Sequence, residues 1–159
     1  MGPALFSTPM LTSRLLPRAQ IAVGILAPDV TTLFNAIGAA VARPGWPCAA
    51  QVSTRLAQRH ARSSVALGHG MALPRAAVPG LPRPTAVFMR MASPLPMNTP
   101  DGEPVANVLC LLVPPPGFGV DRDLLDGLTA SLCDPRVREA LRRAHSVESI
   151  QHLLIAGLP

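Results

Sequence analysis

The nearly continuous apolar run Val105–Val113, with sequence VANVLCLLV, restricts the fold of this chain more than any other segment. A strand that is apolar on both faces is covered on both sides and is typical of the centre of a sheet. Apolar residues at helical spacing are found both before and after this run. The sequence therefore predicts an α/β fold in which helices cover a small sheet.

Helical periodicity is clearest from residue 30 onward. Val30, Leu33, Phe34, Ile37 and Val41 share one helical face, and Asp29 stands where an N-cap is expected. A second helix is predicted over residues 49–61. Further helices are predicted around the leucines at 124–132, from the Asp134-Pro135 pair to residue 144, and after a cap at Ser146.

Besides the central run, three shorter strands are predicted. They fall in residues 15–26 after an initial turn, at 65–67, and at 85–91. Four prolines within 74–84 predict a rigid loop there, and residues 93–104 are turn-rich around Asp101-Gly102.

Length and composition favour one domain with a buried core. The chain has 159 residues, of which 48% are hydrophobic and 14% charged, so a disordered or highly charged scaffold is excluded. We expect residues 1–12 to form a loose arm and residues 13–159 to form a single domain. All 14 cationic residues are arginine, which indicates compositional bias rather than a phosphate-binding footprint. With aromatic residues at 3%, a nucleic-acid partner is disfavoured.

The cysteines and the apolar segments indicate the cellular compartment of the protein. Cys48, Cys110 and Cys133 have no C-x-x-C spacing and are expected to be reduced, packed thiols. No apolar run approaches the roughly 20 residues that span a bilayer, so we expect a cytoplasmic protein without membrane insertion.

The histidines provide only one candidate site. His60, His145 and His152 read as surface residues, and the spacing of the histidines and acids favours neither a metal site nor a cofactor. His69 lies between Gly68 and Gly70, and such a turn can offer backbone N–H groups to an anion. A tight turn with a solvent-facing histidine is the competing interpretation.

Several segments resemble one family in order and spacing. They are RLLPRAQIAV at 14–23, TLFNAIG at 32–38, RHARSSVALGHGMALP at 59–74, VPGL at 78–81 and DGEPVANVLCLLVP at 101–114. From residue 15 to about 154 the chain resembles the fructose–mannitol and nitrogen-regulatory class of IIA proteins of the phosphoenolpyruvate-dependent phosphotransferase system. The resemblance implies a mixed sheet of about five strands with helices on both faces.

The resemblance also implies an activity, and one residue departs from it. Members take a phosphoryl group from a small histidine-phosphorylated carrier protein onto a histidine that follows the Ala-Ile-Pro segment. Arg75 occupies that position here, and a guanidinium has no lone pair with which to attack phosphorus. Counting back from Leu132 places the second family histidine at Asp121, which we expect to pair with Arg75.

Part of the family site is retained, since Arg59 matches its arginine and Ser64 its hydroxyl residue, while His60 stands in place of a glutamate. The residues that could line a pocket or bind an anion are Arg59, Ser64, Gly68, His69, Gly70 and Arg75. With neither family histidine present, no catalytic residue is expected.

Three functions remain open at this point. The first is a degenerate, nitrogen-regulatory IIA-like protein that works by binding the small carrier protein or regulatory targets such as sensor kinases or transporters. The second is an active phosphocarrier that uses His69. The third is a sensor of a phosphorylated metabolite or other anion, formed by Arg59, Arg75 and the Gly68–Gly70 turn.

Overall fold

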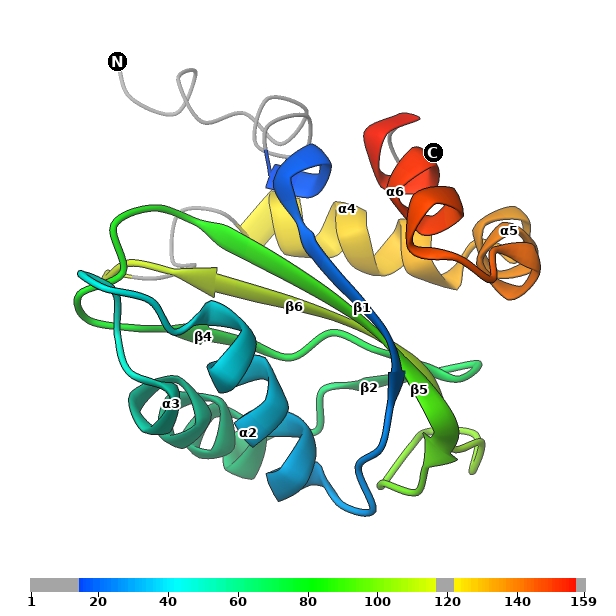
Figure 1. Ribbon diagram of the computed structural model, residues 1–159. Helices are drawn as coiled ribbons and strands as arrows, with labels where there is room; N and C mark the ends of the chain where they lie inside the picture. The colour runs from blue at the N-terminus through cyan, green and yellow to red at the C-terminus, as the bar shows by residue number, and fades with distance from the viewer. Residues whose placement is uncertain (1–14, 117–121, 157–159) are drawn as a thin grey trace.

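A six-stranded mixed sheet organises the molecule (Figure 1). The computed structural model describes residues 15–116 and 122–156. The strands are β1 (Gln20–Ile25), β2 (Ala66–Gly68), β3 (Met71–Ala72), β4 (Arg75–Ala77), β5 (Thr85–Leu95) and β6 (Val105–Val113). The order is β1-β5-β6-β3-β2, and β4 pairs with β6 beyond β3. The predicted central strand is confirmed, because β6 runs antiparallel to β5 and parallel to β3 and β4.

The prediction of a loop over 74–84 is wrong for Arg75–Ala77, which forms β4 against Leu111–Val113. Pro74 and Pro79 flank this short stretch, so only the residues between them keep the N–H groups that a strand needs. Pro74 still accepts from Leu111 N at 2.9 Å through its carbonyl oxygen. The proline thus divides the segment along β6 into β3 and β4, and six strands result where about five were expected.

The helices are η2, a short 3-10 helix (Leu16–Arg18), α2 (Val30–Val41), α3 (Ala49–Arg62), α4 (Arg122–Cys133), α5 (Pro135–Arg143) and α6 (Val147–Ala156). The predicted caps are confirmed. Asp29 Oδ1 accepts from Thr32 N at 2.7 Å, and Asp134 Oδ1 accepts from Arg136 N at 2.8 Å. None of the described helices has the length and hydropathy to cross a membrane.

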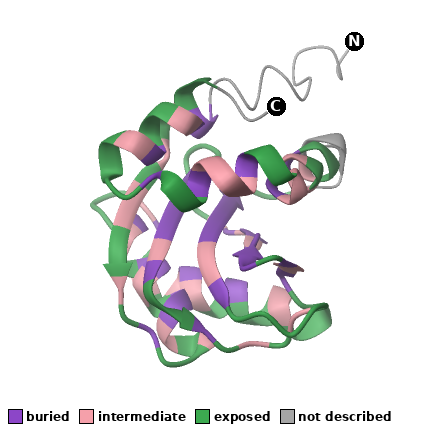
Figure 2. Ribbon diagram, turned by 90° about the vertical axis from the view of Figure 1, so that its right-hand side faces the viewer, coloured by how far each residue is buried: buried purple, intermediate pink, exposed green. Residues whose placement is uncertain are grey.

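Two hydrophobic cores lie on opposite faces of the sheet. Helices α2 and α3 enclose one core, and η2 with α4, α5 and α6 encloses the other (Figure 1). Strand β5 alternates between them, with Val87 and Met89 in the first core and Phe88 in the second. Figure 2 shows the buried residues gathered on the strands between the two helical layers. The predicted helices on both faces are confirmed.

Candidate functional site

The β2–β3 hairpin separates the six predicted site residues into two groups. Gly68, His69 and Gly70 form its tip, with φ angles of 91°, 55° and 75°. These left-handed values explain the two glycines, and they make His69 an unusual residue at its position. Ser64 and Arg75 lie at the other end of the hairpin. Gly70 O accepts from Asn107 N at 3.0 Å, whereas Arg75 lies opposite Leu111, so roughly 15 Å of strand separates the two ends.

Arg75 and Arg59 are near each other at the open end of the hairpin. Arg75 is half-buried on β4, and its Nη1 donates weakly to Leu73 O at 3.4 Å. Burial lowers the pKa of the Arg75 guanidinium, and the charge of Arg59 lowers it further. Arg59 itself donates to Ser63 Oγ at 2.9 Å. No carboxylate among the described residues forms a salt bridge with either arginine, so two positive charges of the described chain lie near each other beside Arg75.

The neighbouring predicted residues have structural partners. Ser64 Oγ donates to Asn98 O at 2.9 Å and accepts from Ala66 N at 3.2 Å, which fixes the start of β2. His60 packs edge-on against Phe34, with ring centroids 5.7 Å apart. Asp121 lies outside the described residues, and its pairing with Arg75 remains a prediction.

Charge is distributed unevenly along the chain. Between residues 30 and 100 there is no Asp or Glu, whereas this stretch contains Arg43, Arg55, Arg59, Arg62, Arg75, Arg83 and Arg90. Three of the arginines interact elsewhere, because Arg43 and Arg83 stack on Trp46 and Arg90 bonds backbone carbonyls. The other four, Arg55, Arg59 and Arg62 of α3 with Arg75 of β4, we call the basic surface. The three on α3 recur at helical spacing and lie beside the buried Val52 and Leu56 on the helix surface.

At the hairpin tip, the backbone N–H group of His69 already donates to a carboxylate of the same chain. His69 N donates to Asp101 Oδ2 at 2.7 Å, and His69 Nδ1 lies 3.9 Å from the same oxygen. Asp101 Oδ1 also accepts from Glu103 N at 3.1 Å. These two backbone donors hold the pKa of Asp101 below its ordinary value of 3.8.

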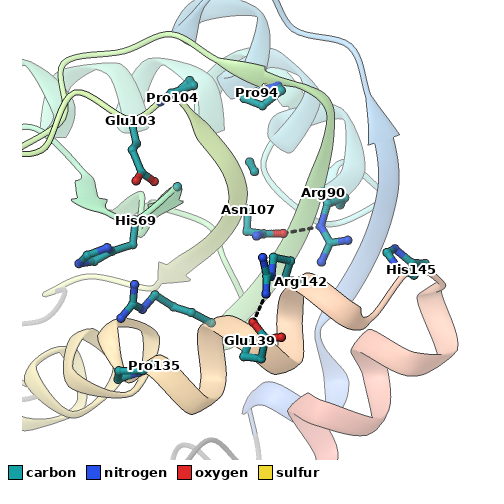
Figure 3. Close-up of a pocket in the computed structure, with 13 residues that line it drawn as sticks. His69, Arg90, Pro94, Glu103, Pro104, Asn107, Pro135, Glu139, Arg142 and His145 are labelled. Atoms are coloured by element: carbon teal, nitrogen blue, oxygen red, sulfur yellow. Dashed lines mark hydrogen bonds and ion pairs between the residues drawn. The ribbon is translucent and has the colours of Figure 1, made fainter.

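A groove of about 810 Å³ runs from this tip along α5 (Figure 3). Its walls come from the hairpin tip, β5, the loop before β6, β6 itself, α5 and the residues after α5. We call it the α5 groove, and it is lined by His69, Gly70, Arg90, Pro94, Glu103, Pro104, Ala106, Asn107, Pro135, Arg138, Glu139, Arg142 and His145.

Sequence reasoning missed most of this groove, because Arg138 and Arg142 on an amphipathic helix resemble an ordinary solvated face. Arg90 was the available signal, since it interrupts the apolar strand TAVFMRM. The structure explains its position. Arg90 donates to Ala144 O at 2.8 Å and to Leu141 O at 2.6 Å, thereby satisfying carbonyls at the end of α5. Burial lowers the pKa of the Arg90 guanidinium.

Comparison with known proteins identifies consistent relatives. The family model for the EIIA 2 component of the phosphoenolpyruvate-dependent sugar phosphotransferase system matches residues 14–156. A fructose-specific EIIA component of Haloferax volcanii is 29% identical over 99 residues, 62% of this chain and 64% of that protein. A nitrogen regulatory protein of Bradyrhizobium diazoefficiens is 30% identical over 100 residues, 62% of this chain and 65% of that protein. The aligned part thus spans less than two thirds of either relative.

Solved structures agree on the fold. Nitrogen regulatory protein IIA-Ntr from Neisseria meningitidis superposes with a TM-score of 0.79 at 27% identity, covering 91% of this chain and 99% of that one. IIA mannitol from Escherichia coli gives 0.69 at 17% identity, covering 85% and 95%, a similarity of fold alone. A IIA mannitol enzyme from the same organism has also been solved in complex with its phosphorylated IIB enzyme.

Proposed function

The chain belongs to the EIIA type 2 family of the phosphoenolpyruvate-dependent sugar phosphotransferase system, and on this premise we propose that it is a degenerate, nitrogen-regulatory IIA-like protein that acts by binding other proteins. The observation that carries the proposal is the guanidinium of Arg75 on β4, at the position that the family resemblance assigns to the phosphorylated histidine. Burial and Arg59 lower its pKa, but an arginine remains protonated in proteins and has no lone pair for phosphorus. Arg75 can contact a phosphate and cannot carry one covalently.

The hairpin geometry weighs against His69 as a replacement acceptor. His69 lies at the tip, roughly 15 Å along β6 from Arg75, and the retained family residues Arg59 and Ser64 lie near the Arg75 end. A phosphoryl donor docked to reach Arg75 would therefore have to bind elsewhere to reach His69.

The partners we propose are the small histidine-phosphorylated carrier protein or regulatory targets such as sensor kinases or transporters. The basic surface, with no acidic residue between positions 30 and 100, favours a partner whose docking face is acidic. Without a phosphorylation cycle at Arg75, such a complex would form independently of phosphoryl flux through the system.

Restoring the imidazole tests this proposal. We expect Arg75→His to gain one phosphoryl group when incubated with phosphoenolpyruvate, the first enzyme of the system and the small carrier protein, as measured by intact mass. The physical reason is that an imidazole nitrogen supplies the missing nucleophile beside Arg59.

Arg75→Gln is the matched control, because it removes the same charge without adding a nucleophile, and it should remain unmodified. Failure of Arg75→His to gain phosphate, with the fold intact by circular dichroism, would contradict a retained docking face for the carrier.

A further inference from the structure

The α5 groove begins at the hairpin tip, at the opposite end of the hairpin from Arg75. Its volume of about 810 Å³ is in the range of sites for small molecules. Most of its charged side chains already have partners. Glu139 bonds Arg142 and Arg143, and Arg90 bonds the end of α5. A ligand of the α5 groove would therefore be bound by the polar groups that have hydrogen-bond donors or acceptors still free.

Asn107 presents donors to the groove. Arg90 Nε donates to Asn107 Oδ1, as the dashed line in Figure 3 marks. Because the carbonyl oxygen of this side chain is fixed by Arg90, its NH2 group is the end that remains available. Asn107 is only partly buried and lines the groove, so this NH2 group can reach an acceptor there.

Among the described residues, Arg138 is a cation of the groove for which no ionic partner is found. It projects from α5 and, in the part of the chain that the structure describes, no carboxylate forms a salt bridge with it. Its Nε is buried and has no hydrogen-bond acceptor among the described residues. A buried donor without an acceptor indicates a missing partner. Arg142, which rises from α5 toward Asn107 in Figure 3, lines the same wall; its Nη2 donates to Glu139, and its other guanidinium N–H groups can donate to a bound acceptor.

We propose that the α5 groove binds a small molecule bearing an oxyanion, a carboxylate or a phosphate, held by Arg138 and Arg142 from α5 and by the Asn107 amide from β6. Guanidinium N–H groups and an amide NH2 group all donate hydrogen bonds, and those from a guanidinium to an oxyanion are charge-assisted. Glu103 is the opposing charge. It lies on the wall above His69, away from α5, and is exposed to water (Figure 3). The site does not depend on the function proposed for the surface around Arg75.

Binding can be measured by NMR titration of the natural chain with inorganic phosphate and, separately, with succinate, at constant ionic strength set by sodium chloride. We expect saturable shifts in the Asn107 side-chain NH2 signals and in the His69 backbone signal. Saturation by phosphate alone, by succinate alone or by both supports the proposal and identifies the oxyanion. Equal shifts from chloride alone would overturn it, because they would report charge screening.

Two variants with opposite expected effects on affinity separate a change in binding from damage to the fold. Arg138→Gln should raise the dissociation constant at least about tenfold, because it removes a charge-assisted hydrogen bond. Glu103→Gln should lower the dissociation constant, because it removes a repelling carboxylate. Arg75→Gln should leave it unchanged, so failure here is distinguishable from failure of the proposed function. Binding unaffected by Arg138→Gln, or shifts confined to residues around Arg75, would overturn the proposal.

Discussion

Asp101 shows how one side chain can hold a strained turn. Its carboxylate accepts from His69 N at 2.7 Å and from Glu103 N at 3.1 Å. His69 has a φ of 55°, a conformation that non-glycine residues rarely adopt. A Cβ at Gly68 would lie 3.3 Å from Asp101 Oδ2, so the carboxylate also limits the size of the residue at that position. The hairpin tip thus depends on the charged form of Asp101.

Acid should therefore destabilise the natural chain partly through Asp101. The pKa of this group is lowered from 3.8 by the two backbone donors, so its contribution is present above pH 3.8 and is lost as pH falls through the lowered value. We expect Asp101→Asn to be less stable than the natural chain at pH 7 and to lose less stability between pH 7 and pH 3. Urea unfolding followed by Trp46 fluorescence measures both differences.

Asp126→Asn is the control, because it changes an exposed acid of α4 that lies outside this turn. Equal acid sensitivity of Asp101→Asn and the natural chain would show that the turn does not depend on this charge.

Among the elements, α2 and α3 lie in close backbone contact at Gly38. A Cβ placed there would lie 2.4 Å from Ala49 O and 3.0 Å from Ala49 C, both backbone atoms at the start of α3. Glycine lowers helix propensity by about 0.5–1 kcal/mol relative to alanine. The close approach explains why the helix contains it, since no side chain fits between the two backbones.

Gly38→Ala should consequently destabilise the protein in spite of alanine's better helix propensity. We expect the free energy of unfolding to fall by about 1–3 kcal/mol, because α3 must move away. Chemical denaturation provides the measurement. Asn35→Ala, on the exposed side of the same helix, should be neutral or slightly stabilising. A stabilised Gly38→Ala protein would contradict the close contact.

How well each element could be predicted depended on its own pattern. The helix at 30–41 and the strand at 105–113 were predicted to the residue, because periodicity and an apolar run respectively leave little choice. Strand β4 was missed, because its pairing is dictated by the neighbouring β6 rather than by its own residues. The position of Arg75 in a site came from the family resemblance, and the α5 groove depends on tertiary contacts that no local pattern contains.

At the scale of the whole molecule, one sheet is shared by two cores. Phe88 and Met89 are adjacent on β5 and are buried on opposite faces. Charge is also divided, since residues 30–100 lack acids whereas residues 101–159 contain eight of the nine, all but Asp29. The shared sheet predicts that the two layers unfold together, and three of the four arginines of the basic surface lie on α3.

Phe88→Ala tests this coupling. Phe88 is fully buried against the layer of α4–α6, and Trp46 packs against the opposite core. We expect the free energy of unfolding to fall by about 3–5 kcal/mol. The midpoints measured by Trp46 fluorescence and by far-UV circular dichroism should shift together to one common value. Leu26→Ala, at a residue 77% exposed, should change stability by less than about 0.5 kcal/mol. A fluorescence midpoint that stays in place while the dichroism midpoint moves would show two independent layers.

The most direct measurement for the proposed function is the intact mass of the natural chain after incubation with phosphoenolpyruvate, the first enzyme and the small carrier protein. Because we propose that Arg75 of β4 occupies the acceptor position, we expect the mass to remain unchanged while a IIA relative that has the histidine gains one phosphoryl group in the same mixture. A phosphoryl group on the natural chain would contradict the account, and its location on His69 would identify a relocated acceptor site.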